Sequence, residues 1–165
     1  MKKKTYLSIL VDNHEGVLTR IASLFRQRGF NIDSLTVSAT NDNTLSRVTI
    51  GLTGDEEEIK QIVNQTKKLY EYEGMYEIDP NDSLIRELLL VKVACNEHIR
   101  SKLLEISSIF KAKIIDVSDG SIVFELTGKP IKLDSYIENL KPYTILEMCR
   151  TGATALQRGK VRLTK

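Results

Sequence analysis

The sequence predicts an α+β protein made of two βαββαβ units in tandem. Apolar residues in strict alternation mark strands, and apolar residues at helical spacing mark helices. The order strand, helix, strand, strand, helix, strand occurs twice along the 165 residues. Each unit can close into a four-stranded antiparallel sheet with two helices on one face, which is the ferredoxin-like plan. The repeat is one of element order, not of sequence.

Composition excludes several classes of function. Hydrophobic residues make up 41% of the chain, charged residues make up 28%, and the formal net charge is +2. The net charge is therefore too small to indicate nucleic-acid binding, and no run of apolar residues approaches the length of a membrane span. We expect a cytoplasmic protein that does not contact a membrane.

The first unit opens with a strand over residues 6–11 and a helix that begins near Val17. Asp12 or Asn13 is the expected helix cap, because a side-chain oxygen there accepts hydrogen bonds from the first helical amides. Gly29 is the expected end of the helix, since glycine readily adopts the left-handed backbone of a C-terminal cap.

The second strand of this unit changes its buried parity near Asp33. Phe30 and Ile32 share one parity, whereas Leu35 and Val37 share the other. Either the first two residues belong to the preceding loop, or a β-bulge redirects the strand. Both interpretations fit the sequence.

The rest of the chain completes the first unit and then repeats its order. A hairpin partner strand, an acidic helix start and a fourth strand are expected at residues 47–52, 55–58 and 72–78. The second unit has strands expected at 88–95, 114–117, 122–127 and 143–149, with helices after Asn96 and after Lys129. These assignments predict a first domain over residues 1–79, a polar linker over 80–83 and a second domain over 84–165.

Cys95 and Cys149 are the only cysteines, so zinc-ligand spacing is absent. Both are expected to be buried or half-buried thiols. Each lies near the end of its strand, and neighbouring antiparallel strands would put the two residues at opposite ends of the sheet. We therefore expect no internal disulfide.

Catalytic motifs are missing from the sequence. It has no glycine-rich phosphate loop, no nucleophile motif and no paired catalytic carboxylates. We expect neither a catalytic site nor a metal site. The turn before the first helix is different, because Asn13 and Gly16 could expose backbone donors for a carboxylate and Asn31 could add an amide. The alternative is that Asn13 only caps the helix and Gly16 only relieves the turn.

Two blocks of sequence carry a resemblance to a known family. The segment DNHEGVLTRIASLFRQRGFNIDSLTV, followed by TLSRVTI, resembles the ACT domain of the regulatory small subunit of acetolactate synthase, also called acetohydroxyacid synthase. The second half resembles that family's C-terminal domain through the segments RELLLVKV, IIDV, FELTG and RTGATALQRG.

The resemblance implies a regulatory subunit that performs no catalysis itself. Such a subunit binds and activates a large subunit, which uses thiamine diphosphate, Mg²⁺ and FAD in branched-chain amino acid synthesis. It also confers feedback inhibition, usually by valine, which binds where two ACT domains meet in a homodimer.

The resemblance also assigns residues to the effector site. Asn13, Gly16 and Asn31 match the family's effector positions, and the residues expected to line the site with them are His14, Val17, Leu18 and Ile32. His14 is not a residue that the motif fixes.

Two further expectations follow from the resemblance. Leu10, on the polar parity of its strand, is expected to be exposed in a monomer and covered in the dimer. The surface that contacts the large subunit is expected at the Arg47 hairpin, at the Arg20 face of the first helix, or on the second helix.

Two other classes of function remain as alternatives. One is a stand-alone ACT-type amino-acid sensor, which pull-down of a large subunit would exclude. The other is a ferredoxin-like nucleic-acid-binding protein, which would show salt-dependent binding to nucleic acid.

Overall fold

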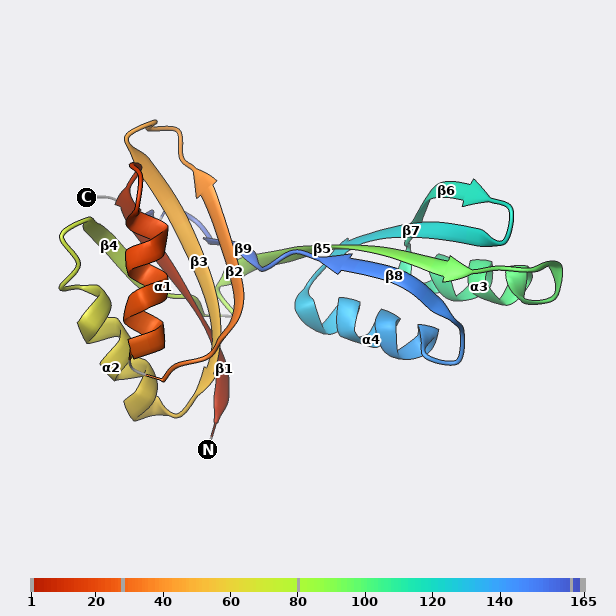
Figure 1. Cartoon of the computed structure of the whole chain (residues 1–165), viewed down its shortest axis with the longest axis horizontal. Coiled ribbons are helices and arrows are strands. Elements are labelled where there is room, and N and C mark those ends of the chain that lie inside the picture. Colours follow the sequence, from red (N-terminus) through yellow and green to blue (C-terminus); the bar gives the residue numbers. More distant parts are fainter. Residues whose placement is uncertain (1, 28, 80, 161, 164–165) are drawn as a thin grey trace. The chain divides into compact units, whose positions relative to one another are not determined.

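The computed structural model describes residues 2–27, 29–79, 81–160 and 162–163. The chain divides into two compact units, unit 1 (Met1–Leu84 and Gly152–Lys165) and unit 2 (Ile85–Thr151). Along the chain (Figure 1) the elements are β1 (Lys3–Asp12), α1 (Val17–Gln27), β2 (Ile32–Ala39), β3 (Leu45–Gly54), α2 (Glu56–Thr66), β4 (Tyr72–Glu77), β5 (Ser83–Ala94), α3 (Glu97–Phe110), β6 (Lys113–Ser118), β7 (Ser121–Gly128), α4 (Pro130–Leu140), β8 (Ile145–Arg150) and β9 (Thr154–Gln157).

Both units have the predicted ferredoxin-like topology. The strand order is β2-β3-β1-β4 in unit 1 and β6-β7-β5-β8 in the second sheet, and neighbouring strands are antiparallel. The prediction of two α+β units with antiparallel sheets is thus confirmed. The short strand β9, which pairs with β5, was not predicted.

The core of unit 1 lies between its sheet and the helices α1 and α2 (Figure 1). Helical spacing predicts that the apolar stripe of α1 consists of Val17, Ile21, Leu24 and Phe25. All of these are buried except Leu24, which is partly buried. The acidic start of α2 forms a capping box, in which Asp55 accepts from the Glu58 amide and Glu58 accepts from the Asp55 amide.

Gly29 ends the first helix as predicted. Its φ is +72°, and its amide donates to the carbonyl of Arg26 over 3.1 Å. The Phe30 amide donates to the carbonyl of Phe25 over 3.1 Å, which completes the hydrogen-bond pattern of a Schellman cap.

A β-bulge accounts for the parity change in β2. Ile32 pairs with Leu52 and Ser34 pairs with Gly51, so the register shifts between Ile32 and Ser34. Ile32 already belongs to the strand, so the bulge accounts for its parity, whereas Phe30 lies in the loop before β2 as the alternative expected.

The second face of the unit 1 sheet is covered by the C-terminal segment of the same unit. Ala153 and Ala155 are each 1% exposed, and the Ala155 carbonyl accepts a 3.5 Å hydrogen bond from Arg47 Nη1. Leu10, which pairs with Arg47, is only 3% exposed in the single chain. The expectation that Leu10 lies exposed in a monomer is therefore wrong.

The predicted linker, residues 80–83, contacts the C-terminal segment through Asp82. Pro80 lies outside the described residues, and Ser83 already begins β5 with 4% exposure. The carbonyl of Asp82 accepts a 3.0 Å hydrogen bond from the Arg158 amide. The segment after Thr151 therefore packs in unit 1, whereas the sequence-based boundaries put it in the second domain.

Unit 2 has its own core between its sheet and the helices α3 and α4. Asn96 caps α3 as predicted, with its Oδ1 accepting from the amides of His98 and Ile99. In α4, helical spacing predicts a buried stripe of Ile131, Leu133, Ile137 and Leu140. The prediction is wrong at Ile131, which is 73% exposed. Tyr136 is fully buried instead.

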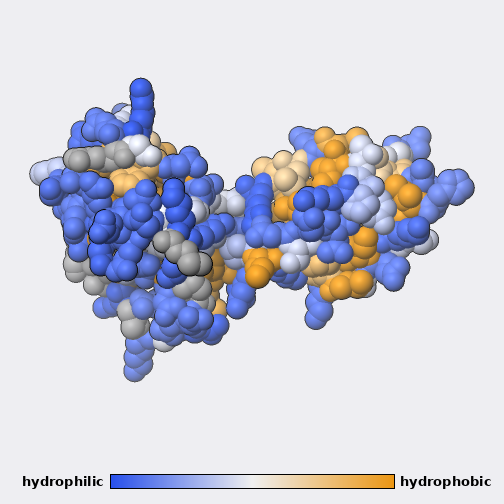
Figure 2. Space-filling model, turned by 90° about the horizontal axis from the view of Figure 1, so that it is seen from below, coloured by the Kyte–Doolittle hydropathy of each residue, from blue (hydrophilic) through white to orange (hydrophobic). Residues whose placement is uncertain are grey.

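The surface of unit 2 carries large apolar side chains, which Figure 2 shows as orange patches. Examples with at least 47% of the residue exposed are Ile109, Ile131, Leu146 and Met148. Cys149, whose strand partner is Leu90, is exposed, so the expectation of a buried or half-buried thiol is wrong for it. Cys95 is buried.

Candidate functional site

The turn between β1 and α1 is open in front of Gly16. Gly16 has a φ of +86°, and a Cβ built there would meet no described atom within 4 Å. The carbonyl of Gly16 accepts the Arg20 amide over 3.0 Å, which is the first bond of the helix. The amides of Val17 and Leu18 precede that bond, so they are among the helix donors that a bound anion can satisfy.

Asn13 holds this turn against the β2–β3 hairpin. Its amide donates to the carbonyl of Thr44 over 2.7 Å, and its Nδ2 donates to the carbonyl of Asn43 over 2.9 Å. Its Oδ1 accepts from Ser46 Oγ over 3.0 Å. Asn13 is therefore a tether and not the expected helix cap, although one N–H and one lone pair of its amide group remain for a ligand.

The other residues predicted for this turn differ in where their side chains lie. Val17 is 6% exposed and belongs to the core, so only its backbone can face a ligand. Leu18 is 44% exposed and offers an apolar surface beside the turn. His14 is exposed, and its Nδ1 lies 2.9 Å from the carbonyl oxygen of Glu15.

Asn31 and Ile32 lie at the opposite end of the sheet. Asp12, at the start of the turn, pairs with Leu45 at the beginning of β3, whereas Ile32 pairs with Leu52 near its end. Seven residues of β3 separate these two positions, which is roughly 23 Å of strand. One chain therefore does not bring Asn31 to the Gly16 turn.

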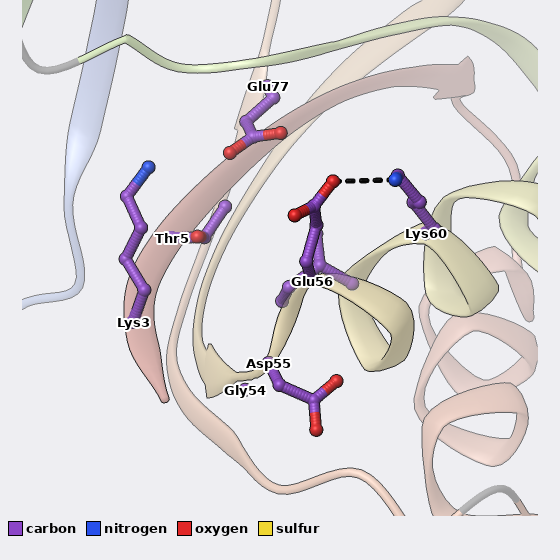
Figure 3. Close-up of a pocket in the computed structure, with 8 residues that line it drawn as sticks. Lys3, Thr5, Gly54, Asp55, Glu56, Lys60 and Glu77 are labelled. Carbon is purple, nitrogen blue, oxygen red and sulfur yellow. Dashed lines mark hydrogen bonds and ion pairs between the residues drawn. The ribbon is translucent and has the colours of Figure 1, made fainter. Parts of the chain in front are cut away.

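A hollow of unit 1 lies away from the Gly16 turn, near the first residue of β1 and the start of α2 (Figure 3). It has a volume of about 400 Å³, and its lining includes Lys3, Thr5 and Glu77. The amides of Asp55 and Glu58 are used by the capping box, and Glu56 pairs with Lys60 over 2.6 Å. That hydrogen bond and the charge of Lys60 lower the pKa of Glu56. The hollow is thus lined by ordinary helix-cap and surface chemistry.

At two of the three surfaces expected to contact a large subunit, the arginine has a partner within unit 1, although the Arg20 side chain remains 58% exposed. Arg47 Nη1 donates to Tyr76 Oη over 3.2 Å and lies under the C-terminal segment. Arg20 forms an ion pair with Glu71. These pairings were not predicted, because each joins residues at least 29 positions apart.

The segment RTGATALQRG begins in unit 2 with Arg150 and Thr151 and continues in unit 1 from Gly152. In unit 2, Arg150 Nε donates to Glu87 Oε2 over 2.7 Å and Nη1 donates to Asp134 Oδ1 over 2.5 Å. Burial lowers the pKa of Arg150, but the hydrogen bonds and charges of these two carboxylates raise it by more. In unit 1, a Cβ built on Gly152 would lie 2.5 Å from Thr36 Oγ1.

Within residues 2–27, 29–79, 81–160 and 162–163, no three His, Cys, Asp or Glu side chains gather where they could hold a metal ion. Within the same residues, no helix is both long enough and apolar enough to cross a membrane.

Comparison with known proteins identifies the family of the chain. A family profile described as "AHAS small subunit-like ACT domain" matches residues 7–71, and one described as "Small subunit of acetolactate synthase" matches residues 86–159. The chain belongs to the acetolactate synthase small-subunit family. Unit 1 therefore contains an ACT domain, and the family name implies a catalytic partner subunit.

Individual relatives agree along nearly the full chain. The acetolactate synthase small subunit of Mycolicibacterium smegmatis is 40% identical over 93% of this chain and 90% of its own length. That of Mycobacterium bovis is 41% identical over 96% of this chain and 95% of its own length. The crystal structure of the small subunit from Thermotoga maritima matches with a TM-score of 0.87 and 37% identity, covering 96% of this chain and 99% of that one.

Proposed function

We propose that this chain is a regulatory subunit without a catalytic site of its own, which activates a large acetolactate synthase subunit and makes it sensitive to valine. In this proposal the thiamine diphosphate, Mg²⁺ and FAD belong to the large subunit, and both subunits work in the cytoplasm. Membership of the small-subunit family supports the partnership. The geometry of unit 1 supports the effector site.

The main observation behind the proposed effector site is that its two halves, the Gly16 turn and Asn31, are separated within one chain. The Gly16 turn and Asn31 lie at opposite ends of the unit 1 sheet, roughly 23 Å apart along β3. A site that uses both needs two chains. We propose that a homodimer joins the Gly16 turn of one chain to Asn31 of the other.

The edge strand β2 is suited to this dimer. It lies at the edge of the unit 1 sheet, with β3 as its neighbour among the described strands. If two β2 strands pair antiparallel about a two-fold axis, the beginning of each strand meets the end of the other. The end of β2 leads into the hairpin that Asn13 binds, so the partner's Asn31 would reach the Gly16 turn.

The groups that the two halves of the site bring together complement the carboxylate, ammonium group and side chain of an amino acid. The first amides of α1 can donate to the carboxylate, and the partner's Asn31 can offer its amide oxygen to the ammonium group. Leu18, at 44% exposure, adds apolar surface for an aliphatic side chain. Gly16 permits a close approach of the ligand to the backbone, because the space before it is open.

Reconstitution with the matching large subunit tests the regulatory role. Acetolactate formation should rise when this chain is added, and it should fall again as valine is titrated, with leucine and isoleucine as comparison ligands. If the large subunit neither binds this chain nor changes its activity, the proposed function is wrong.

Mixed dimers test the two-chain site directly. Gly16→Asp and Asn31→Ala homodimers should each fail to bind valine. A dimer with one chain of each kind has one site carrying both changes and one site carrying neither, so it should bind one valine in place of two. If the site lay within a single chain, the mixed dimer would bind none.

A further inference from the structure

We infer that the ion pair between Arg20 and Glu71 positions the start of α1 and thereby sets the affinity of the Gly16 turn for its effector. The inference rests on the effector site proposed above. It adds two positioning residues that lie outside the predicted site.

The carboxylate of Glu71 is buried, which is unusual for a charged side chain. Glu71 lies between α2 and β4, and its side chain is only 2% exposed. Its carboxylate oxygen Oε1 accepts a hydrogen bond from Nη1 of Arg20, across 51 positions of sequence. The Arg20 side chain is 58% exposed, so the pair joins a surface cation to a buried carboxylate. Loss of the cation would leave that buried carboxylate unpaired, which destabilises the fold.

Arg20 is also unusually placed along its helix. It lies in the first turn of α1, where the helix dipole disfavours a positive charge, and that turn has no acidic residue of its own. The favourable electrostatic partner is therefore supplied from outside the helix by Glu71. This arrangement ties the first turn of α1 to the beginning of β4.

The pair is connected to both flanks of the Gly16 turn. The Arg20 amide donates to the Gly16 carbonyl over 3.0 Å, and the Asp12 amide donates to the Glu71 carbonyl over 3.0 Å. Glu71 thus holds the last residue of β1 through its backbone and the first turn of α1 through its side chain. The register of β1 against β4 shifts between Leu10 and Val11, immediately before this contact.

Asn13 and Glu71 therefore hold the turn from two directions. Asn13 binds the β2–β3 hairpin, and Glu71 binds α1 from the start of β4. Backbone donors bind a carboxylate more tightly when their positions are fixed before the ligand arrives, because ordering them on binding would reduce the affinity. Loss of the Arg20–Glu71 pair should loosen the helix start and weaken effector binding.

The test uses the full chain together with its large subunit, and valine as the probe. Arg20→Lys keeps the charge but lacks the planar guanidinium, and it should bind valine about threefold more weakly. Glu71→Gln removes the ion pair, and it should bind at least tenfold more weakly. Lys141→Met breaks an exposed ion pair with Glu138 at the end of α4 in unit 2, and as the matched control it should leave the Kd within twofold of wild type.

Folding and partner binding are measured separately. Arg20→Met leaves a buried carboxylate unpaired and can prevent folding, so the two milder variants decide the test. Valine binding is measured well below the melting temperature of each variant, where a purely structural role would leave the Kd unchanged. Activation of the large subunit without valine should equal that of wild type.

Three results separate the possibilities. If Arg20→Lys and Glu71→Gln both bind valine within twofold of wild type, the inference is wrong. If they lose activation without valine while keeping the Kd, Arg20 contacts the large subunit and the inference is again wrong. If the wild-type chain does not bind valine, or if the Gly16→Asp variant binds it as tightly as wild type, the proposed effector site itself is wrong.

Discussion

Replacement of Gly16 by aspartate should abolish valine binding while the fold survives. A non-glycine residue in the left-handed region costs about 1 kcal/mol or somewhat more, so strain at the φ of +86° is tolerable. That loss corresponds to a fall in melting temperature of roughly 4–8 °C for a domain of this size. The new carboxylate would face the valine carboxylate, and two such charges about 4 Å apart near a protein surface repel by about 4 kcal/mol. A repulsion of this size lowers the affinity for valine roughly a thousandfold.

Gly120→Asp is the matched control for backbone strain. Gly120 has a φ of +77°, and a Cβ built there also meets no described atom within 4 Å, but it lies in the β6–β7 turn of unit 2. Both variants should lose similar stability in thermal unfolding, and only Gly16→Asp should lose valine binding in calorimetry. The reasoning is refuted if Gly16→Asp binds valine within threefold of wild type, or if Gly120→Asp loses binding to the same extent.

Three further predictions concern residues whose roles the tertiary structure revealed. Tyr136→Phe should lower the free energy of unfolding by about 1 kcal/mol in urea, because it removes a buried 2.8 Å hydrogen bond with Ser107. Burial raises the pKa of Tyr136, so the unfolded chain loses this proton first and wild-type stability should fall above about pH 10; an equal decline in the variant would contradict this. Gly152→Val should cost about 1–3 kcal/mol and speed amide hydrogen exchange of the C-terminal segment, because its Cβ would lie 2.5 Å from Thr36 Oγ1; unchanged exchange would exclude tight docking there. Leu10→Glu should lose about 3–5 kcal/mol at every protein concentration, whereas a loss confined to concentrations that form dimers would restore Leu10 to the dimer interface.

Local signals predicted most of the fold correctly. The stripe Val17, Ile21 and Phe25 predicted the buried face of α1, and Gly29 predicted its end, because each depends on residues within a few positions of one another. The parity change near Asp33 likewise predicted a bulge, although the sequence alone left a longer loop as an alternative. Strand pairing then followed from the order of the elements.

Residues whose partners lie far away in sequence were predicted less well. Asn13 was expected to cap its own helix, but the fold brings the hairpin at Asn43 within hydrogen-bond distance. Leu10 was expected on an open face, but the chain returns after Thr151 and covers that face. Tyr136 was missed as a core residue although its spacing from Leu133 and Leu140 fits a buried helical stripe, and only the fold revealed that Ser107 on another helix pairs with its hydroxyl group.

The candidate site shows the same division. The sequence by itself determined which residues are candidates for the site, because a turn with Asn13 and Gly16 before an amphipathic helix can be recognised from neighbouring residues alone. Only the tertiary structure decided where they lie. It separates Asn31 from Gly16 along β3, and it supports the turn with Glu71. The physical reason is that strand register and buried ion pairs join distant segments, and spacing along one chain carries no record of those distances.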